Sequence, residues 1–225
     1  ALNNYERSIS LNPKNPDVYN NMGNILMEMG QLDNALARYS EAIALNENYS
    51  QAYNNCGLVL HALNRIEEAL VSYDRAIFLD SNYAEPHWNK SLTLLLLGEY
   101  KQGLELYEWR WKTEEYSKHK RNFTQPLWLG VEDISGKTIL LHAEQGLGDT
   151  IQFCRYASLV KAKGAKVILE VQKPLLGLLK SLEGVDVLIE QGYPIPNFDY
   201  HCPLLSLPLA FKTTLSTIPA PTPYL

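Results

Sequence analysis

The segment Gly146-Leu147-Gly148-Asp149 combines the residue types best suited to chemistry in this sequence. Two glycines let a ligand come close to the backbone, and N–H groups at the start of a following helix favour anions. The carboxylate of Asp149 can take a proton from an attacking hydroxyl that lies within hydrogen-bond distance. A structural interpretation is equally complete, because Asp149 with Gln152 three residues later matches a helix capping box in which Asp149 is the N-cap. The two roles are compatible in one residue.

Two nucleotide-binding motifs fit this segment less well. In a dinucleotide fingerprint, G-x-G-x-x-G, Ile151 stands where the third glycine belongs, and Asp149 would place a negative charge beside the pyrophosphate. Glu170 follows about a strand and a helix later, where that motif has its ribose-binding acid. A P-loop is excluded because no Gly-Lys-Ser/Thr follows the glycines. A nucleotide-binding regulator is therefore only a remote option for this chain.

Strands and helices must alternate around this loop to position it. The pattern predicts strands at 138–143, 166–171, 186–189 and 198–202, and helices at 150–163 and 174–182. Alternation of this kind favours a parallel sheet. The glycine-rich loop then follows the first strand and lies at the carboxyl ends of the strands, where open parallel sheets bind ligands. We place this α/β domain at 137–225, after a linker at 118–136 that begins with the basic cluster Lys118-His119-Lys120-Arg121.

The first half of the chain repeats itself every 34 residues. The coincident positions are Tyr19/Tyr53, Asn21/Asn55/Asn89, Gly23/Gly57, Leu26/Leu60/Leu94, Ala35/Ala69, Tyr39/Tyr73/Tyr107, Ala42/Ala76 and Leu45/Leu79. Glycine facing alanine lets two antiparallel helices approach closely, while Gly30, Asn64 and Gly98 suit a turn with positive φ. The predicted helix-pair repeats span 16–49, 50–83 and 84–117, after half a repeat at 1–15.

This pattern resembles the tetratricopeptide repeat (TPR) family, whose helix pairs stack into a superhelix with an extended binding surface. The resemblance implies a helical scaffold that holds a protein or peptide in its groove. The third repeat departs from the pattern, because Ser91 replaces the packing glycine and Arg110 stands where alanine is expected. Since terminal repeats are atypical, we interpret this repeat, with Trp109 and Trp111, as the joint to the next domain.

Asn21, Asn55 and Asn89 occupy one position of the first helix in three successive repeats. Identical side chains at a repeat position line up along a superhelix, and an amide can bond the N–H and C=O groups of an extended peptide without contacting its side chains. The position resembles the peptide-binding asparagine ladder of the O-linked N-acetylglucosamine (O-GlcNAc) transferases. The alternative is that these asparagines only cap or solvate the helix face.

The run from Gly146 to Phe153 resembles the start of the heptosyltransferase-like glycosyltransferases. The stretch 136–225 also resembles the α/β part of bacterial TPR-fused proteins of that group, including the run 200–208. In the heptosyltransferases the aspartate of the Leu-Gly-Asp motif faces the acceptor sugar and is the proposed general base, which implies that role for Asp149. The candidate substrate contacts are Gln145, Gly146, Leu147, Gly148, Gln152 and His201, the last chosen for its place near a strand end.

The resemblance implies a GT-B fold, of which this chain carries the acceptor-side, Rossmann-like half behind a TPR superhelix. Its implied function is transfer of a sugar from a nucleotide sugar to a hydroxyl of a sugar, glycan or protein acceptor, with the TPR stack recruiting a protein partner. The second GT-B domain holds the nucleotide sugar. The sequence ends at Pro219, Pro221 and Pro223, about where that domain would begin, so we expect the chain as given to be inactive. The alternative is a non-catalytic TPR interaction scaffold whose α/β domain is structural or binds a small ligand.

The composition narrows the class of protein. The 225 residues are 46% hydrophobic and 20% charged with a net charge of −5, which is ordinary for a globular chain. Nucleic acid is not a predicted partner because no long basic stripe is present. Three widely spaced cysteines without a CxxC pair predict no metal site and no disulfides, and favour a cytoplasmic location. The most apolar run, 92–97, is too short to span a bilayer. No cofactor is predicted, and the helical pattern at residue 1 suggests a piece of a longer protein.

Overall fold

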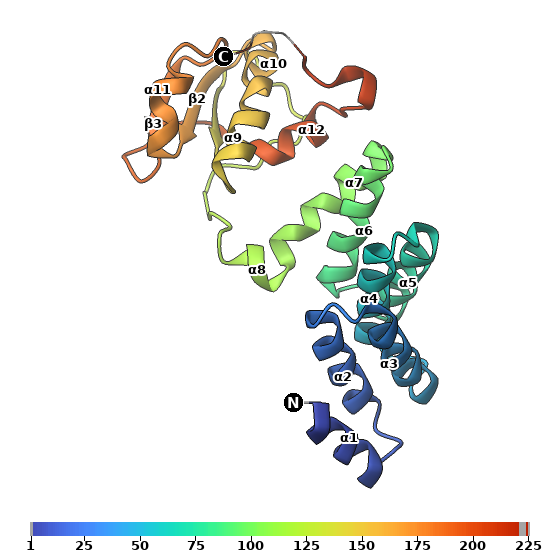
Figure 1. The fold of residues 1–225 in the computed structure, drawn as a ribbon. Helices are drawn as coiled ribbons and strands as arrows, with labels where there is room; N and C mark the ends of the chain where they lie inside the picture. Colours follow the sequence, from blue (N-terminus) through green and yellow to red (C-terminus); the bar gives the residue numbers. More distant parts are fainter. Residues whose placement is uncertain (1, 221–223, 225) are drawn as a thin grey trace. The chain divides into compact units, whose positions relative to one another are not determined.

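The structure is a computed structural model that describes residues 2–220 and 224 (Figure 1). The first residue of the predicted half repeat, and Pro221 and Pro223 of the predicted proline-rich end, lie outside the described residues. The chain divides into two compact units, unit 1 at 1–115 and unit 2 at 116–225. Each unit has its own set of elements and is described by itself.

Unit 1 consists of helices that pair in the order that the 34-residue repeat predicts. They are α1 (Leu2–Leu11), α2 (Pro16–Glu28), α3 (Leu32–Leu45), α4 (Ser50–Ala62), α5 (Ile66–Leu79), α6 (Ala84–Leu96), α7 (Tyr100–Tyr107) and the 3-10 helix η1 (Glu108–Lys112). The pairs are α2 with α3, α4 with α5 and α6 with α7. Their turns contain Gly30 (φ 72°), Asn64 (φ 59°) and Gly98 (φ 81°), so both the pairs and the positive-φ turns are confirmed.

A glycine of the first helix meets a tyrosine of the second helix in each of the first two repeats. A Cβ atom added at Gly57 would lie 2.4 Å from Cε1 of Tyr73, and one at Gly23 would lie 2.5 Å from Cε1 of Tyr39. Both rings are buried. The repeat alanines Ala35, Ala42, Ala69 and Ala76 are fully buried as well. The predicted close approach of the two helices is therefore present, and it depends on the absence of a side chain at the glycine.

The third repeat ends differently because Arg110 occupies the position of the buried repeat alanines. Helix α7 stops at Tyr107 and continues as η1, while the guanidinium of Arg110 is fully buried between the rings of Tyr107 and Trp111. It donates hydrogen bonds to the carbonyl oxygen of Tyr107 and to Oε1 of Glu108. Trp109 stacks on His87 of α6 with ring centroids 3.7 Å apart. These contacts of the two tryptophans lie within unit 1.

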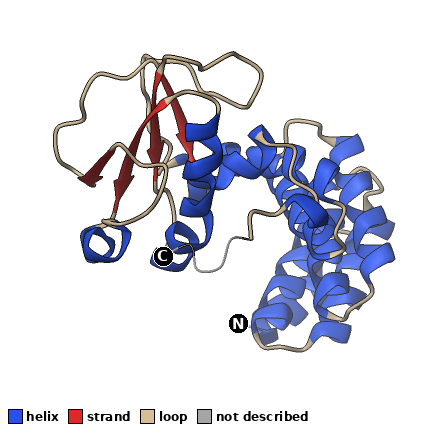
Figure 2. Cartoon of the chain, turned by 90° about the horizontal axis from the view of Figure 1, so that it is seen from above, coloured by secondary structure: helices blue, strands red, loops and turns tan. Residues whose placement is uncertain are grey.

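Unit 2 contains a four-stranded, fully parallel sheet (Figure 2). Its strands are β1 (Thr138–His142), β2 (Lys166–Val171), β3 (Val187–Glu190) and β4 (Tyr200–Pro203), in the order β3-β2-β1-β4. In this register Leu140 of β1 lies opposite Ile168 of β2 and His201 of β4. The centre of the sheet is buried on both faces, since Ile139, Leu140 and Leu141 are all fully buried. The predicted parallel sheet is confirmed, with strand ends shifted by at most two residues.

Short helices connect the strands of unit 2. They are α9 (Leu147–Phe153), η2 (Cys154–Tyr156), α10 (Ala157–Ala162), η3 (Lys173–Leu175), α11 (Leu176–Leu179), η4 (Leu204–Ser206), α12 (Leu207–Ala210) and η5 (Leu215–Thr217). The helix predicted at 150–163 therefore begins earlier and contains a 3-10 turn, and the one predicted at 174–182 is shorter. α8 (Glu114–Ser117) spans the change from unit 1 to unit 2 in the chain.

The segment 118–136, which we predicted to be a linker, is part of unit 2. Trp128 is fully buried and packs edge-on against Phe211, with ring centroids 5.7 Å apart. The N–H of Trp128 donates to the carbonyl oxygen of His201, and the N–H of His201 donates to that of Pro126. Leu127 thereby forms a parallel bridge with His201 beside β4. The prediction was wrong because the basic cluster at its start suggested a solvated connection, whereas the apolar residues after it pack on the sheet.

The contact between Gly57 and Tyr73 predicts a specific loss of stability. Gly57→Ala should lower the free energy of unfolding of unit 1 by about 1–3 kcal/mol, since the added methyl group overlaps a buried ring. Gly177→Ala, also in a helix but with open space around its Cβ position, should be neutral or slightly stabilising. Urea unfolding of both variants measures this, and equal effects of the two changes would contradict the packing account.

Candidate functional site

A pocket of about 490 Å³ lies at the carboxyl ends of β1, β2 and β3. It is lined by Tyr116, His119, Ala143, Glu144, Gln145, Gly146, Asp149, Gln172 and Gln191. The residues Ala143 to Gly146 follow β1, Gln172 follows β2, and Gln191 follows β3. Of the site residues that we predicted, the substrate contacts Gln145 and Gly146 and the catalytic candidate Asp149 are brought together here. Leu147 and Gly148 are the first two residues of α9 and are exposed, but they do not line the pocket.

Asp149 holds the start of α9, but not as the N-cap that we predicted. The N-cap is Gly146, and Asp149 is the third residue of the helix. Its Oδ2 accepts a hydrogen bond of 3.0 Å from the backbone N–H of Gly146. This is the reciprocal half of a capping box, since a glycine N-cap has no side chain to supply the other half. Gln152 is exposed and lies outside the pocket lining, so its proposed pairing with Asp149 was wrong.

Gln172 connects the ends of β1 and β2, and the sequence analysis missed it. Its Nε2 donates a hydrogen bond of 2.8 Å to the carbonyl oxygen of Gln145. Its Oε1 accepts one of 2.9 Å from the hydroxyl of Thr150, which is buried at the first turn of α9. The glutamine therefore fixes the glycine-rich loop against the next strand. The signal was present in the sequence, because Gln172 directly follows a predicted strand, as the loop itself does.

The polar groups of the pocket favour a neutral or cationic ligand over an anion. Glu144 and Asp149 contribute carboxylates, and Gln145, Gln172 and Gln191 contribute side-chain amides. Neither lysine nor arginine is among its lining residues. Phosphate sites in proteins generally use such cations or a run of converging backbone N–H groups, and here the N–H of Gly146 is bonded to Asp149. Amides and carboxylates in this number suit a ligand rich in hydroxyl groups.

His201 does not belong to this pocket. It is the second residue of β4, opposite Leu140, and its Nδ1 lies 3.3 Å from Nε2 of His142 on β1. Burial, together with the positive charges of Arg121 and Lys120, lowers the pKa of His201 from 6.5 to about 4. Because β4 begins two residues later than we expected, His201 lies within the strand instead of at its carboxyl end, and its role as a substrate contact stays a prediction.

The repeat asparagines form a hydrogen-bonded network across α2, α4 and α6. Nδ2 of Asn55 donates to Oδ1 of Asn20 (3.0 Å) and of Asn24 (3.1 Å), both on the preceding repeat. Nδ2 of Asn89 likewise donates to Oδ1 of Asn54 at 2.9 Å. An amide nitrogen has two hydrogens, so Asn55 has used both and Asn89 has used one. Asn21 is exposed. The three equivalent positions therefore differ in what they can still offer a peptide.

Among the described residues, no group of three or more His, Cys, Asp or Glu side chains could hold a metal ion. The part of the chain that the structure describes contains no helix long and apolar enough to cross a membrane. The three cysteines, Cys56, Cys154 and Cys202, are buried and unpaired by disulfides. Burial raises the pKa of the Cys56 thiol to about 12, which makes it unreactive at neutral pH.

The amide network predicts unequal effects of two equivalent mutations. Asn55→Ala should lower the free energy of unfolding of unit 1 by about 1–2 kcal/mol, since it removes two hydrogen bonds between repeats. Asn21→Ala, at an exposed position, should change that free energy by less than about 0.5 kcal/mol. Chemical denaturation of the two variants measures the difference. Similar effects would mean that the network contributes nothing to the stacking of repeats.

Comparison with known proteins agrees with the helix pairs of unit 1. Residues 23–64 and 57–98 match a family model described as TPR repeat, and residues 4–37 match one described as Tetratricopeptide repeat. No curated protein matches the chain.

Among solved structures, MamA is 21% identical over 51% of this chain and 67% of its own, with a TM-score of 0.46. YrrB, described as a TPR protein with an unusual peptide-binding site, is 22% identical over 52% and 60%, with a TM-score of 0.48.

A third solved structure, the first TPR of Spaghetti (RPAP3) bound to an HSP90 peptide, is 17% identical over 44% of this chain and 79% of its own, with a TM-score of 0.42. This chain therefore spans between about three fifths and four fifths of the length of these structures. The family-model matches begin at residue 4 and end at residue 98, inside unit 1. Residues 4–98 of this chain are tetratricopeptide repeats.

Proposed function

We propose that this chain is an interaction protein whose TPR unit holds an extended segment of another polypeptide along α2, α4 and α6. The observation that carries the proposal is the network of asparagine side chains that runs across these three helices. Ordered amides at a repeating position lose little freedom on binding, which favours association. They also match the donor and acceptor pattern of an extended main chain.

The groups available to such a peptide belong to Asn89, which is part of the network, and to Asn21, which lies on α2 next to the network residue Asn20. Asn21 is exposed on α2, and Asn89 on α6 keeps one N–H and its oxygen for a partner. Neighbouring helices lie roughly 10 Å apart, so these two asparagines are separated by roughly 20 Å, the length of about six extended residues. Asn55, between them, supports the network and does not donate to the peptide.

An apolar patch lies beside Asn89 and would select an apolar side chain of the peptide, in addition to the contact with the peptide main chain. Leu92 and Leu96 follow Asn89 at the i+3 and i+7 positions of α6, which puts all three on one helix face. Their side chains are exposed by 43% and 69%. The partner proposed here is therefore an extended peptide with at least one large apolar residue, placed at the α6 end of the row.

Peptides that bind the full chain are first selected from a random twelve-residue display library. Fluorescence anisotropy then measures how tightly each selected peptide binds the chain and its variants, which tests the proposal. The double variant Asn21→Ala, Asn89→Ala should bind them at least roughly tenfold more weakly, since each lost hydrogen bond is worth about 1 kcal/mol. Asn34→Ala removes an exposed asparagine from α3, outside the row, and serves as the matched control. Unchanged affinity of the double variant for every selected peptide would reject main-chain recognition by this row.

Sugar transfer is the second candidate function, and unit 2 favours it in two ways. The order β3-β2-β1-β4 is that of the first four strands of a doubly wound nucleotide-binding sheet, which supports the Rossmann-like half of a GT-B fold. The pocket lies at the carboxyl ends of those strands and offers amides and carboxylates, which suit the hydroxyls of an acceptor sugar better than the phosphates of a nucleotide sugar. Asp149 lines this pocket and would act as the general base.

Saturation-transfer NMR of the full chain with a panel of free hexoses and heptoses tests the sugar site. We expect at least one sugar to bind, and Asp149→Asn to weaken it by roughly tenfold through loss of a charge-assisted hydrogen bond. Asp186→Asn is the control, because Asp186 bonds Lys161 and the N–H of Val167 and does not line the pocket. Binding of inorganic phosphate in place of any sugar would contradict the proposed ligand class.

A further inference from the structure

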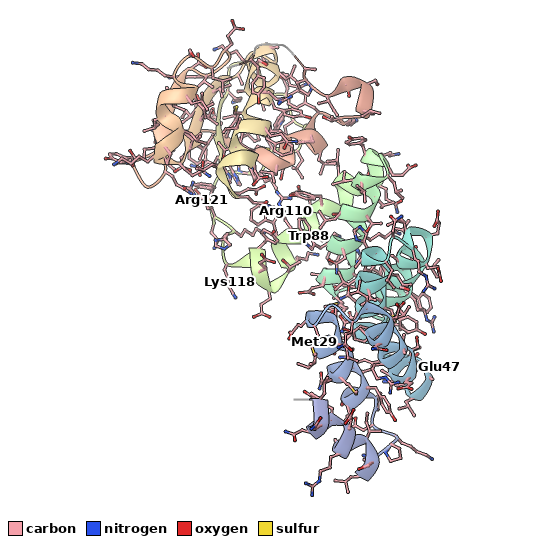
Figure 3. All side chains as sticks on the ribbon, viewed as in Figure 1. Met29, Glu47, Trp88, Arg110, Lys118 and Arg121 are labelled. Carbon is pink, nitrogen blue, oxygen red and sulfur yellow. The ribbon has the colours of Figure 1, made fainter. Side chains whose placement is uncertain are left out.

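The segment 116–128, here called the strap, crosses unit 2 and contributes a wall of the pocket. Tyr116 and His119 at its start line the pocket. Leu127 and Trp128 at its end bond to β4 through the backbone of His201. Between these ends lies Arg121 (Figure 3). Its guanidinium pairs with the carboxylate of Glu170 on β2. The strap is therefore fixed along β4, and a single ion pair holds its middle to the sheet.

Glu170 depends on the strap for its only charged partner among the described residues. Its side chain is 1% exposed and lies near the carboxyl end of the inner strand β2, opposite His142 in the parallel register. One carboxylate oxygen pairs with Arg121, and the other accepts no hydrogen bond from a described residue. A buried carboxylate without a partner is strongly unfavourable. Arg121 itself is 30% exposed, so it can leave the sheet with far less penalty than Glu170 can.

The second contact of the strap is aromatic and covers two histidines. The ring of Phe123 packs against His142, His201 and Phe198, with ring centroids 5.5, 4.7 and 5.3 Å away. The guanidinium of Arg121 lies over the same phenylalanine ring. Phe123 therefore closes the strap over the histidine pair, and anything that charges this pair acts on both contacts of the strap at once.

The charged groups around the histidine pair set the effect of acid. Arg121 and Lys120 face it from the strap, and Glu170 faces His142 from β2. A proton on His201 is opposed by burial and by both strap cations, which is why the pKa of His201 falls from 6.5 to about 4. A proton on His201 adds a further positive charge beside Arg121 and Lys120, which weakens the hold of Arg121 and Phe123 on the sheet.

We propose that the strap is a movable wall of the pocket, latched by Arg121 to Glu170, and that protonation of the His142–His201 pair opens it. The role of the strap as a pocket wall rests on the ligand site proposed for unit 2. Opening of the strap needs no ligand. The proposed opening can therefore be wrong while the proposed ligand site is right, and the reverse. At neutral pH the wall is closed and Tyr116 and His119 complete the pocket; in acid the pocket loses that side.

The pKa of His201 gives the size of the expected effect. Because the closed state holds His201 at a pKa of about 4 and the open state returns it to 6.5, the open state binds more protons between these values. The closed state is therefore fully favoured above pH 6.5 and loses stability as the pH falls towards 4. From pH 7.5 to pH 5.0 the open-to-closed ratio should rise roughly thirtyfold through His201 alone.

Hydrogen exchange of the full chain, read by mass spectrometry and corrected for the intrinsic pH dependence, measures this ratio. In the wild type, protection of the strap amides on either side of Arg121, including those of His119 and Lys120, should fall roughly thirtyfold between pH 7.5 and pH 5.0, while the anchored amide of Trp128 stays protected. Peptides from β2 should stay protected at both pH values. Less than a threefold change in the strap, or equal loss in β2, would overturn the proposal.

Variants separate the latch from the pH sensor. Arg121→Gln changes a residue whose side chain is 30% exposed. At pH 7.5 the strap amides of this variant should exchange as fast as those of the wild type do at pH 5.0. Glu170→Gln should do the same without leaving a buried charge. His201→Gln should remove most of the pH dependence, while Asp186→Asn, another change of carboxylate to amide in unit 2, should leave it intact. A strap that stays closed in Arg121→Gln, with β2 protected, would disprove the latch.

Discussion

The parallel pairing of β1 with β2 on one side and with β4 on the other is the constraint on which unit 2 depends. It brings the ends of β1, β2 and β3 to one edge, where Gln172 bonds to the loop after β1 and a polar pocket remains. The same register places His142, Glu170 and His201 on one face of the sheet, under the strap. The pocket and its movable wall are thus two consequences of one hydrogen-bond ladder.

Unit 1 satisfies a different constraint, since each first helix must pack both on the second helix of its own repeat and on the helices of the neighbouring repeats. Contacts between glycine and tyrosine pack the two helices of a repeat together. Hydrogen bonds between asparagine side chains connect one repeat with the next. Asparagines at the same position of successive repeats therefore make different hydrogen bonds. Asn55, in the middle, uses both amide hydrogens within the stack, whereas Asn89 uses one and Asn21 is exposed. Position in the array, as much as residue type, therefore decides which amide groups remain for the peptide that we propose.

The sequence predicted the elements whose signals are local or periodic, and missed contacts that only tertiary packing creates. The 34-residue spacing was sufficient for the helix pairs, and the apolar runs were sufficient for the parallel strands. Asp149 was found, but its place in α9 was not, because a glycine can serve as N-cap and leave no side-chain signal. Arg121 was read as part of a solvated linker, since its partner Glu170 is 49 residues away in the chain. Gln172 was missed although it directly follows a predicted strand, because its partners Gln145 and Thr150 lie 27 and 22 residues away in the chain.

Side-chain amide signals in ¹⁵N NMR spectra of the full chain test the central claim, that the asparagine row of unit 1 binds an extended peptide. The chain is titrated with a selected twelve-residue peptide, and the NH₂ resonances are assigned by single substitution. The account predicts saturable shifts for Asn21 and Asn89, with the same affinity as the peptide shows in anisotropy, and little change for Asn34 on α3. The account would be contradicted if only NH₂ signals from the second helices shifted, while those of Asn21 and Asn89 stayed unchanged at saturation.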